Sequence, residues 1–282
     1  MKKQFILSII LLFFTSLLKA QQNNIIINSV LPTVRILADS FYIPQLNRNR
    51  IIRICLPIDY NTNLKRRYPV IYMHDGQNLF DKKTSFAGEW GIDECLDSLQ
   101  KLSGKGFIVV GIDNGGDKRI DELTPWPHKK YGGGEGAKYI DFITQTLKPF
   151  IDKKYRTLPK RENTIIGGSS LGGLISVYAA FKYPEVYGKV INFSPAYWIN
   201  LDSIKMYIHN RPLKYKIQIY SYAGEKEGKE MIDPFAEMEF YFKEAGIKEK
   251  DRFMTQSPDG EHKEFYWRRE FPKAIVWLFN IK

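Results

Sequence analysis

Five short runs of apolar and β-branched residues recur along the middle of the chain, and helical patterns separate them. The runs cover residues 70–73, 107–112, 164–166, 190–193 and 217–220. Buried parallel strands have this composition, because helices cover both of their faces. The helical patterns span residues 92–102, 139–155, 171–183, 234–245 and 272–279. This alternation predicts an α/β fold with a doubly wound, mostly parallel sheet and helices on both faces.

Two β-rich segments precede the alternation, at residues 24–27 and 50–57, and they predict initial antiparallel strands. No Pro/Gly/Ser linker and no internal repeat divides the rest of the chain. Residues 21–282 therefore fit one α/β domain that is large enough to bury a full core. In such a sheet, functional side chains gather on the loops after the carboxyl ends of the strands.

The first twenty residues have the layout of a secretory signal peptide. Lys2 and Lys3 precede an apolar run at residues 5–14, and Ala20 offers a cleavage site. Leu18 is larger than the residue usually found two positions before the cleavage-site alanine, so an uncleaved anchor is the alternative. No later run is long enough to span a bilayer. We expect cleavage after Ala20, no stable membrane insertion of the mature chain, and a periplasmic or secreted location.

The chain is moderately basic. Its formal net charge of +11 falls to +8 when Lys2, Lys3 and Lys19 are removed with the predicted signal peptide. The remaining basic residues are scattered along the sequence and form neither a basic helix nor an aromatic-lined strip. A solvated surface explains this pattern better than a nucleic-acid groove, so we expect no nucleic-acid partner.

The sequence contains only two cysteines, Cys55 in a strand-like run and Cys95 in a helical one. Both are expected to be small buried apolar residues. An exported protein can form disulfides, but sequence spacing does not place these two residues within bridging distance. There is no Cys/His cluster with metal-ligand spacing, and the expected chemistry needs neither a metal nor a cofactor.

The strongest chemical signal is a Gly-x-Ser-x-Gly turn formed by Gly168, Ser170 and Gly172, between an apolar run and a helical one. The two glycines have no Cβ, so a strand and a helix can approach closely while Ser170 projects from the turn between them. The backbone N–H of Leu171, at the start of the helix, would help stabilise an oxyanion. A small-residue turn without chemistry also fits a five-residue pattern. The partners of Ser170 therefore decide between the two interpretations.

A serine nucleophile on such a sheet is expected to be followed along the chain by an acid and then by a histidine. The chain has four histidines. His74 and His128 precede Ser170, and His209 lies before the next strand and so before any acid of the expected loop. His262 lies in a polar turn before the last predicted helix. It is the predicted base.

The acid is expected in the loop that follows the strand ending near residue 222. Glu225 and Glu227 both lie in this loop, after Gly224. Asp233 is better explained as the N-cap of a helix that has Pro234 in its first turn. We favour Glu227, because the interval after Gly224 lets the loop turn back toward the histidine. Glu225 is the alternative.

The second donor of an oxyanion hole is expected from the loop after residues 70–73. Gly76 permits an unusual backbone turn, and the N–H of Gly76 or of Gln77 would point at the substrate carbonyl. Asp75 is expected to be a structural hydrogen-bond acceptor, because a carboxylate beside a developing oxyanion would oppose the reaction.

Together these residues resemble the putative-esterase family of α/β-hydrolases over residues 45–280. The likeness rests on YMHDGQNLFD at 72–81, YRT at 155–157, GSSLGG at 168–173, SPAYW at 194–198, GEKE at 224–227 and GEH at 260–262, with Trp267 soon after. The family includes enterochelin-type siderophore esterases, feruloyl and acetyl-xylan esterases, S-formylglutathione hydrolases and mycolyltransferases. The resemblance implies the α/β-hydrolase fold, with Ser170 as nucleophile, His262 as base and a glutamate after Gly224 as acid.

We therefore expect an exported serine esterase that hydrolyses carboxylic esters through an acyl-enzyme. The expected substrate is a small-molecule or polysaccharide-linked ester, either a carbohydrate acetyl or feruloyl ester or a siderophore ester. An acyltransferase with the same triad and a non-catalytic ligand-binding protein are the alternatives.

Four residues are candidates for substrate binding, because they lie in loops expected to overhang the site: Trp90, Arg119, Tyr197 and Trp198. Aromatic side chains can stack on a sugar or a phenolic ring, but they can equally pack the loops themselves. Arg119 can bind a substrate carboxylate, although pairing with a nearby acid is the stronger expectation.

Overall fold

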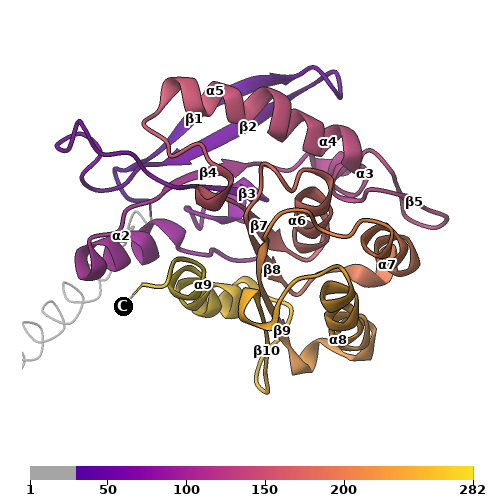
Figure 1. The fold of residues 1–282 in the computed structure, drawn as a ribbon. Helices are drawn as coiled ribbons and strands as arrows, with labels where there is room; N and C mark the ends of the chain where they lie inside the picture. Colours follow the sequence, from indigo (N-terminus) through magenta and orange to yellow (C-terminus); the bar gives the residue numbers. More distant parts are fainter. Residues whose placement is uncertain (1–29, 282) are drawn as a thin grey trace, which may run out of the picture.

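A twisted eight-stranded sheet organises the computed structural model, which describes residues 30–281 (Figure 1). Its strands, in spatial order, are β1 (Val34–Ile43), β2 (Arg48–Cys55), β4 (Ile108–Ile112), β3 (Val70–His74), β7 (Thr164–Ser169), β8 (Lys189–Phe193), β9 (Gln218–Gly224) and β10 (Arg252–Ser257). β2 is antiparallel to both β1 and β4, and all the other neighbouring pairs are parallel. The predicted mostly parallel α/β sheet is confirmed.

Helices cover both faces of the sheet, as predicted (Figure 1). One face carries α4 (Gly136–Phe142), α5 (Lys148–Lys154), α6 (Leu171–Lys182), α7 (Leu201–His209) and α8 (Lys229–Glu244). The other face carries α2 (Ile92–Ser103) and α9 (Glu264–Phe279). The short helix α3 (Arg119–Leu123) follows β4, and a two-stranded hairpin of β5 (Pro127–His128) and β6 (Gly132–Gly133) comes next. Within residues 30–281, no helix is both long and apolar enough to cross a bilayer.

The sequence missed the two strands at the edges of the sheet. β1 and β10 carry few fully buried side chains, so neither has the continuous apolar run that marks the central strands. The predicted segment 50–57 corresponds to β2, which is antiparallel as expected. The predicted strand at residues 24–27 and the predicted signal peptide at residues 1–20 lie outside the described residues.

Two helices begin earlier than predicted, and both contain a proline. α8 begins at Lys229, directly after Gly228 turns the chain with a φ of 86°, so Asp233 is not an N-cap and Pro234 lies inside the helix. α9 begins at Glu264 and contains Pro272. Proline favours the first turn of a helix, so the sequence predicted that each helix starts at its proline, and both predicted starts were wrong.

Both cysteines are free thiols. Cys55 is buried, as expected, whereas Cys95 is only half-buried. Burial raises the pKa of each thiol to about 12. Because the thiolate is the reactive form, neither cysteine is suited to nucleophilic chemistry.

A buried ion pair fixes the first antiparallel strands to the loops that follow β4. The Nη2 atom of Arg50, on β2, lies 2.7 and 2.8 Å from the carboxylate oxygens of Glu122 on α3. Arg48 Nη1 contacts the same carboxylate at 3.0 Å and Glu135 Oε2 at 2.7 Å. The side chains of Arg50 and Glu122 are almost fully shielded from solvent. Removal of one partner would therefore leave an uncompensated buried charge.

We predict that Glu122→Ala lowers the free energy of unfolding by about 3–5 kcal/mol, as for other buried pairs that lose one partner. Chemical denaturation checks this value. Lys101→Ala is the control, because it breaks an exposed ion pair with Asp97 and should cost less than about 1 kcal/mol. Equal losses in the two variants would show that Arg50 does not depend on Glu122.

Candidate active site

Ser170 occupies a strained turn between β7 and α6. Its backbone φ is 58° and its ψ is −123°, values that non-glycine residues rarely adopt. Two hydrogen bonds hold this conformation: the Ser170 N–H donates to the carbonyl of Phe193 at 3.0 Å, and the Ser170 carbonyl accepts from the N–H of Ala196 at 3.0 Å. Backbone strain that the surroundings enforce in this way is typical of functional sites.

The glycines on either side of Ser170 allow the close approach that the sequence predicted. A β-carbon on Gly168 would lie 3.1 Å from the Cα of Gly172 and 3.3 Å from the His74 ring. A β-carbon on Gly172 would lie 3.2 Å from the Cβ of His74. All three distances are tighter than ordinary packing, so larger residues would push α6 away from β7 and move the serine.

Glu227 and His262 lie in contact, although 35 residues separate them in the chain. The His262 Nδ1 atom is 2.7 Å from Glu227 Oε2. Glu227 Oε1 accepts hydrogen bonds from the Ser194 hydroxyl at 2.6 Å and from the Gly224 N–H at 2.7 Å. The Glu227 side chain is 0% exposed and the His262 side chain 36% exposed. Glu225 is exposed, so the structure brings Glu227 rather than Glu225 to the histidine.

Ser194 extends this hydrogen-bond network, and the sequence reasoning gave it no role. Its hydroxyl donates to Glu227 and accepts from Trp267 Nε1 at 2.8 Å. The Trp267 ring also stands perpendicular to the His262 ring, with centroids 5.0 Å apart. One signal was available in the sequence, because Ser194 directly follows β8, whose carboxyl end neighbours that of β7.

An inner pocket of about 200 Å³ contains both Ser170 and His262 in its wall. The other lining residues are Asp75, Asn78, Phe86, Ala87, Arg119, Ser169, Glu264 and Trp267. The pocket thus collects residues from the loops after β3, β7 and β10, at the carboxyl edge of the parallel strands. This is the edge at which the sequence predicted the site.

Arg119 lines the inner pocket, but its guanidinium group donates hydrogen bonds to Asp75. Its Nε and Nη2 atoms lie 2.7 and 2.9 Å from the two Asp75 oxygens, and Asn114 Nδ2 lies 2.7 Å from Oδ1. Burial opposes ionisation of Asp75, but the Arg119 guanidinium outweighs it and lowers the pKa of the carboxyl. Asp75 is therefore a structural acceptor, as expected, and Arg119 has the acidic partner that was expected for it.

Glu264 is a pocket residue that the sequence reasoning missed. It is 5% exposed, lines the inner pocket, and accepts a hydrogen bond from Asn78 Nδ2 at 3.3 Å. Burial raises the pKa of its carboxyl. Its position two residues after His262, at the start of α9, was the available signal. The inner pocket therefore carries a second carboxyl group besides that of Asp75, and the Arg119 charge partly offsets the effect of burial on its pKa.

The predicted oxyanion donors flank the inner pocket. Leu171 is the first residue of α6, and Gly76 and Gln77 form the start of the 3₁₀ turn η1 (Gly76–Asn78) after β3. A β-carbon on Gly76 would lie 2.6 Å from the carbonyl carbon of Gly111, so only glycine fits there. The Gln77 side chain accepts a hydrogen bond from the Asn114 N–H at 3.1 Å. Their backbone roles toward a substrate stay predictions.

The structure corrects the expectation that Trp90 and Tyr197 overhang the site. Trp90 is buried and stacks on Phe193 with centroids 5.7 Å apart. Tyr197 is buried, and its hydroxyl accepts a hydrogen bond from Asn192 at 2.9 Å. Both rings fill space between the sheet and its helices. Trp198 is 40% exposed but does not line the inner pocket.

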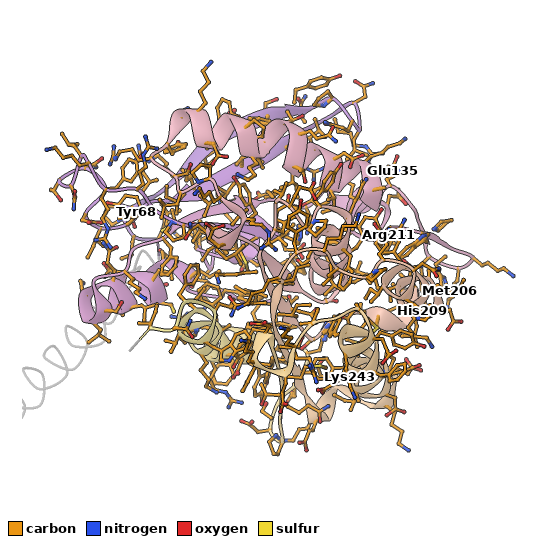
Figure 2. The ribbon with its side chains drawn as sticks, in the orientation of Figure 1. Tyr68, Glu135, Met206, His209, Arg211 and Lys243 are labelled. Atoms are coloured by element: carbon orange, nitrogen blue, oxygen red, sulfur yellow. The ribbon has the colours of Figure 1, made fainter. Side chains whose placement is uncertain are left out.

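The other three histidines lie away from the inner pocket. His74 is buried, bonds the Tyr139 hydroxyl at 3.0 Å, and has its pKa lowered to about 4 by burial, so it is neutral. His128 stacks on Tyr131. His209 ends α7 at the outer margin of the molecule (Figure 2). Among residues 30–281, His262 is the histidine that lines the pocket.

In the described part of the chain, one group of carboxylates lies close enough together to hold a metal ion. Oxygens of Glu89, Asp93 and Glu94, around the start of α2, lie within 4.8 Å of one another. Asp93 Oδ2 also accepts the Leu31 N–H at 2.9 Å, and burial raises the pKa of Asp93 to about 7. None of the three lines the inner pocket.

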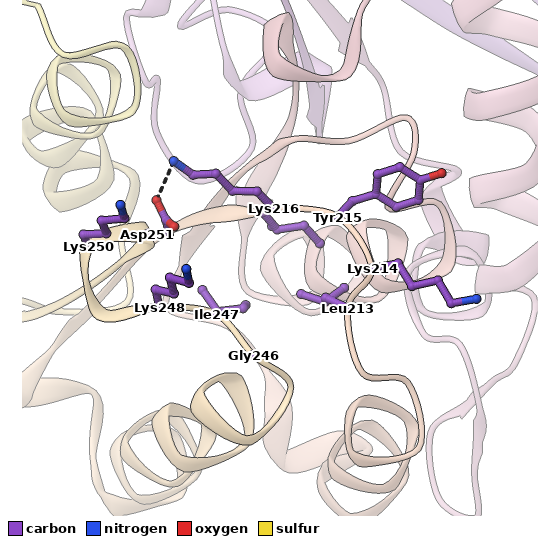
Figure 3. Close-up of a pocket in the computed structure, with 10 residues that line it drawn as sticks. Leu213, Lys214, Tyr215, Lys216, Gly246, Ile247, Lys248, Lys250 and Asp251 are labelled. Atoms are coloured by element: carbon purple, nitrogen blue, oxygen red, sulfur yellow. Dashed lines mark ion pairs between the residues drawn. The ribbon is translucent and has the colours of Figure 1, made fainter.

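A basic pocket of about 260 Å³ lies at the opposite edge of the sheet, before the amino ends of β9 and β10 (Figure 3). It contains Lys214, Lys216, Lys248 and Lys250, of which Lys216 pairs with Asp251 at 2.8 Å. The sequence gave no sign of this cluster, because residues 213–217 and 246–251 meet only in the fold.

Comparisons with known proteins agree with this architecture. A family model described as "Putative esterase" matches residues 43–278. The uncharacterized protein YbbA of Bacillus subtilis (strain 168) is 28% identical over 247 residues, 82% of this chain and 93% of YbbA. The endo-1,4-beta-xylanase/feruloyl esterase of Xylanibacter ruminicola is 26% identical over 255 residues, 86% of this chain and 31% of that protein.

Solved structures show the same fold. The enterobactin esterase of Shigella flexneri superposes with a TM-score of 0.67 at 18% identity, covering 90% of this chain and 61% of that one. The mostly parallel eight-stranded sheet with helices on both faces is thus the α/β-hydrolase fold.

We predict that Gly224→Ala disturbs the contact between Glu227 and His262. A β-carbon at residue 224 would lie 2.3 Å from the carbonyl carbon of Gly260, so the loops after β9 and β10 must separate. Overpacking of this kind costs about 1–3 kcal/mol. We expect the imidazole NMR signals of His262 to shift. Gly104→Ala is the control for a strained alanine away from the site: a β-carbon there meets nothing within 4 Å, and the strain at its φ of 71° lies at the end of α2, so the His262 signals should not shift. Unchanged His262 signals in Gly224→Ala would contradict the prediction.

Proposed function

The chain belongs to the putative-esterase family and is a carboxylic ester hydrolase, and on this premise we propose that Ser170, His262 and Glu227 form its catalytic triad. One observation carries the proposal. The fully buried carboxylate of Glu227 holds Nδ1 of His262 at 2.7 Å, and His262 shares the wall of the inner pocket with Ser170. This is the arrangement by which an acid orients a histidine toward a serine.

The geometry supports a definite path for the proton. With Nδ1–H donating to Glu227, the Nε2 atom of His262 is left to accept the proton of the Ser170 hydroxyl. Oγ then attacks the ester carbonyl, and His262 gives the proton to the departing alcohol, which leaves an acyl-enzyme. Water, activated by the same histidine, releases the acid and restores the serine. The N–H groups of Leu171 and of Gly76 or Gln77 would stabilise the oxyanion.

The proposed substrate is an acetyl or feruloyl ester of a carbohydrate, or a siderophore ester. The name of the Xylanibacter relative includes a feruloyl esterase activity and supports the first class. The names of two sequence relatives support the second class: the iron(III) salmochelin esterase of Escherichia coli and the siderophore triacetylfusarinine C esterase of Aspergillus fumigatus are each 26% identical, over 54% and 53% of this chain. The Shigella enterobactin esterase shares the fold alone. A periplasmic or secreted location is proposed from the signal-like residues 1–20.

Ser170→Ala is expected to abolish hydrolysis of p-nitrophenyl acetate, because no acyl-enzyme can form without Oγ. Loss of a triad member lowers turnover by roughly 10⁴- to 10⁶-fold. Steady-state kinetics on the purified mature chain gives the answer. Ser169→Ala removes the same atom from the neighbouring residue and should lose far less activity. Near-normal turnover in Ser170→Ala would overturn the proposed mechanism.

Replacement of the two loop glutamates separates their roles. Glu227→Gln should lower kcat strongly, by up to about 10⁴-fold as for other triad acids, because an amide no longer fixes the tautomer of His262. Glu225→Gln is the matched control, and its exposed side chain should matter little. Rates on one aryl ester, with circular dichroism as a check on folding, decide the question. A larger loss in Glu225→Gln would disprove the assignment.

A further inference from the structure

The Ser194 hydroxyl is the buried group through which Trp267 reaches Glu227. Its Oγ atom lies 2.8 Å from Trp267 Nε1 and 2.6 Å from Glu227 Oε1, and Ser194 is fully buried. An indole N–H can only donate a hydrogen bond, so Oγ must accept from Trp267. The hydroxyl proton is then left to donate to Glu227. Trp267 thereby determines the direction in which the hydroxyl points.

The backbone at Ser194 is strained in a way that serine does not favour. Its φ is 40°, in the left-handed region that glycine adopts at much lower cost. Its N–H donates to the carbonyl of Tyr222 on β9 at 2.6 Å, which holds this conformation. A strained, buried polar residue beside a functional site is a candidate for a role in that site. The hydroxyl is the group that glycine would not supply.

Trp267 contacts both members of the acid–base pair. Its N–H acts on Glu227 through Ser194, and its ring stands perpendicular to the His262 ring with centroids 5.0 Å apart. The indole is buried and packs against Trp90, with centroids 5.7 Å apart. The His262 side chain is 36% exposed, so the orientation of the imidazole depends on these few contacts.

The groups that hold Oε1 of Glu227 are neutral. They are the Ser194 hydroxyl and the Gly224 N–H, while His262 contacts Oε2. Within residues 30–281, no lysine or arginine forms an ion pair with this carboxylate. A cation there would compete with His262 for the negative charge. Neutral donors fix the carboxylate and leave its charge to stabilise the imidazolium that forms during the reaction.

Resting on the proposed triad, we infer that Ser194 and Trp267 are positioning residues of the reaction. Trp267 directs the Ser194 hydroxyl, Ser194 holds Oε1 of Glu227, and Oε2 is thereby kept against Nδ1 of His262. Neither residue transfers a proton. Their contribution grows as charge develops on the imidazole, so their loss should lower kcat and leave KM close to its wild-type value.

Ser194→Gly gives the sharpest kinetic test, because glycine removes the hydroxyl and also relieves the positive φ. We expect kcat for p-nitrophenyl acetate to fall by about 10- to 100-fold, the rate equivalent of one hydrogen bond to a charged group, with little change in KM. Asn280→Gly is the control. Asn280 has a φ of 47°, is exposed at the end of α9, and should be replaceable at wild-type kcat. Wild-type kcat in Ser194→Gly, or a loss mainly in KM, would overturn the inference.

Trp267→Phe removes the indole N–H and keeps an aromatic ring beside His262. We expect kcat to fall by about two- to tenfold, as for one neutral hydrogen bond. Because the N–H acts through the Ser194 hydroxyl, Trp267→Phe should cost little further activity when added to Ser194→Gly. Fully additive losses would contradict the inference. Trp277→Phe makes the same change later on α9, outside the inner pocket, and should keep wild-type kcat.

A spectroscopic measurement separates positioning from folding. The Nδ1–H proton of His262 should give a downfield NMR signal, because it is hydrogen-bonded to Glu227. This signal should move or broaden in Ser194→Gly and stay in place in Asn280→Gly; an unchanged signal in Ser194→Gly would disprove the inference. If Ser170→Ala is inactive while Ser194→Gly keeps full activity, only the positioning inference fails. If hydrolysis persists in Ser170→Ala, the proposed triad fails and this inference falls with it.

Discussion

The buried carboxylate of Glu227 holds together the three loops on which the site depends. It lies in the loop after β9 and receives a hydroxyl from the loop after β8, the backbone N–H of the last residue of β9, and an imidazole from the loop after β10. A carboxylate shielded from water is stable only when such donors replace its hydration. The need to satisfy one charge therefore fixes the relative positions of Ser194, Gly224 and His262.

Much of the site was readable in the sequence because its signals are local or ordered along the chain. The glycines around Ser170 reflect a steric need that is visible in five residues, and chain order alone separated His262 from the other histidines. In the sequence, the interval after Gly224 favours Glu227 over Glu225. The structure explains why the two glutamates differ: the 3₁₀ turn at Glu225–Glu227 buries the side chain of Glu227 and leaves that of Glu225 exposed.

The features that the sequence did not reveal depend on contacts between distant segments. An acidic partner was expected for Arg119, but the acid it contacts, Asp75, lies 44 residues away in the chain, and Ser194 lies 73 residues from its partner Trp267. Whether an aromatic side chain in a loop covers the site or fills the core is also decided by packing, which is why Trp90 and Tyr197 were misplaced. The distribution of charge over the surface also depends on the fold. The lysine cluster lies at the amino edge of the strands, so the basic character of the chain says little about its pockets at the carboxyl edge.

The backbone of Ser170 creates a conflict between durability and activity at a single position. Its positive φ is unfavourable for serine but ordinary for glycine. Glycine at this position would relieve the strain and also remove the hydroxyl. Selection for heat resistance alone would therefore favour an inactive protein with a relaxed turn. Directed evolution of this protein consequently needs an activity screen at every round.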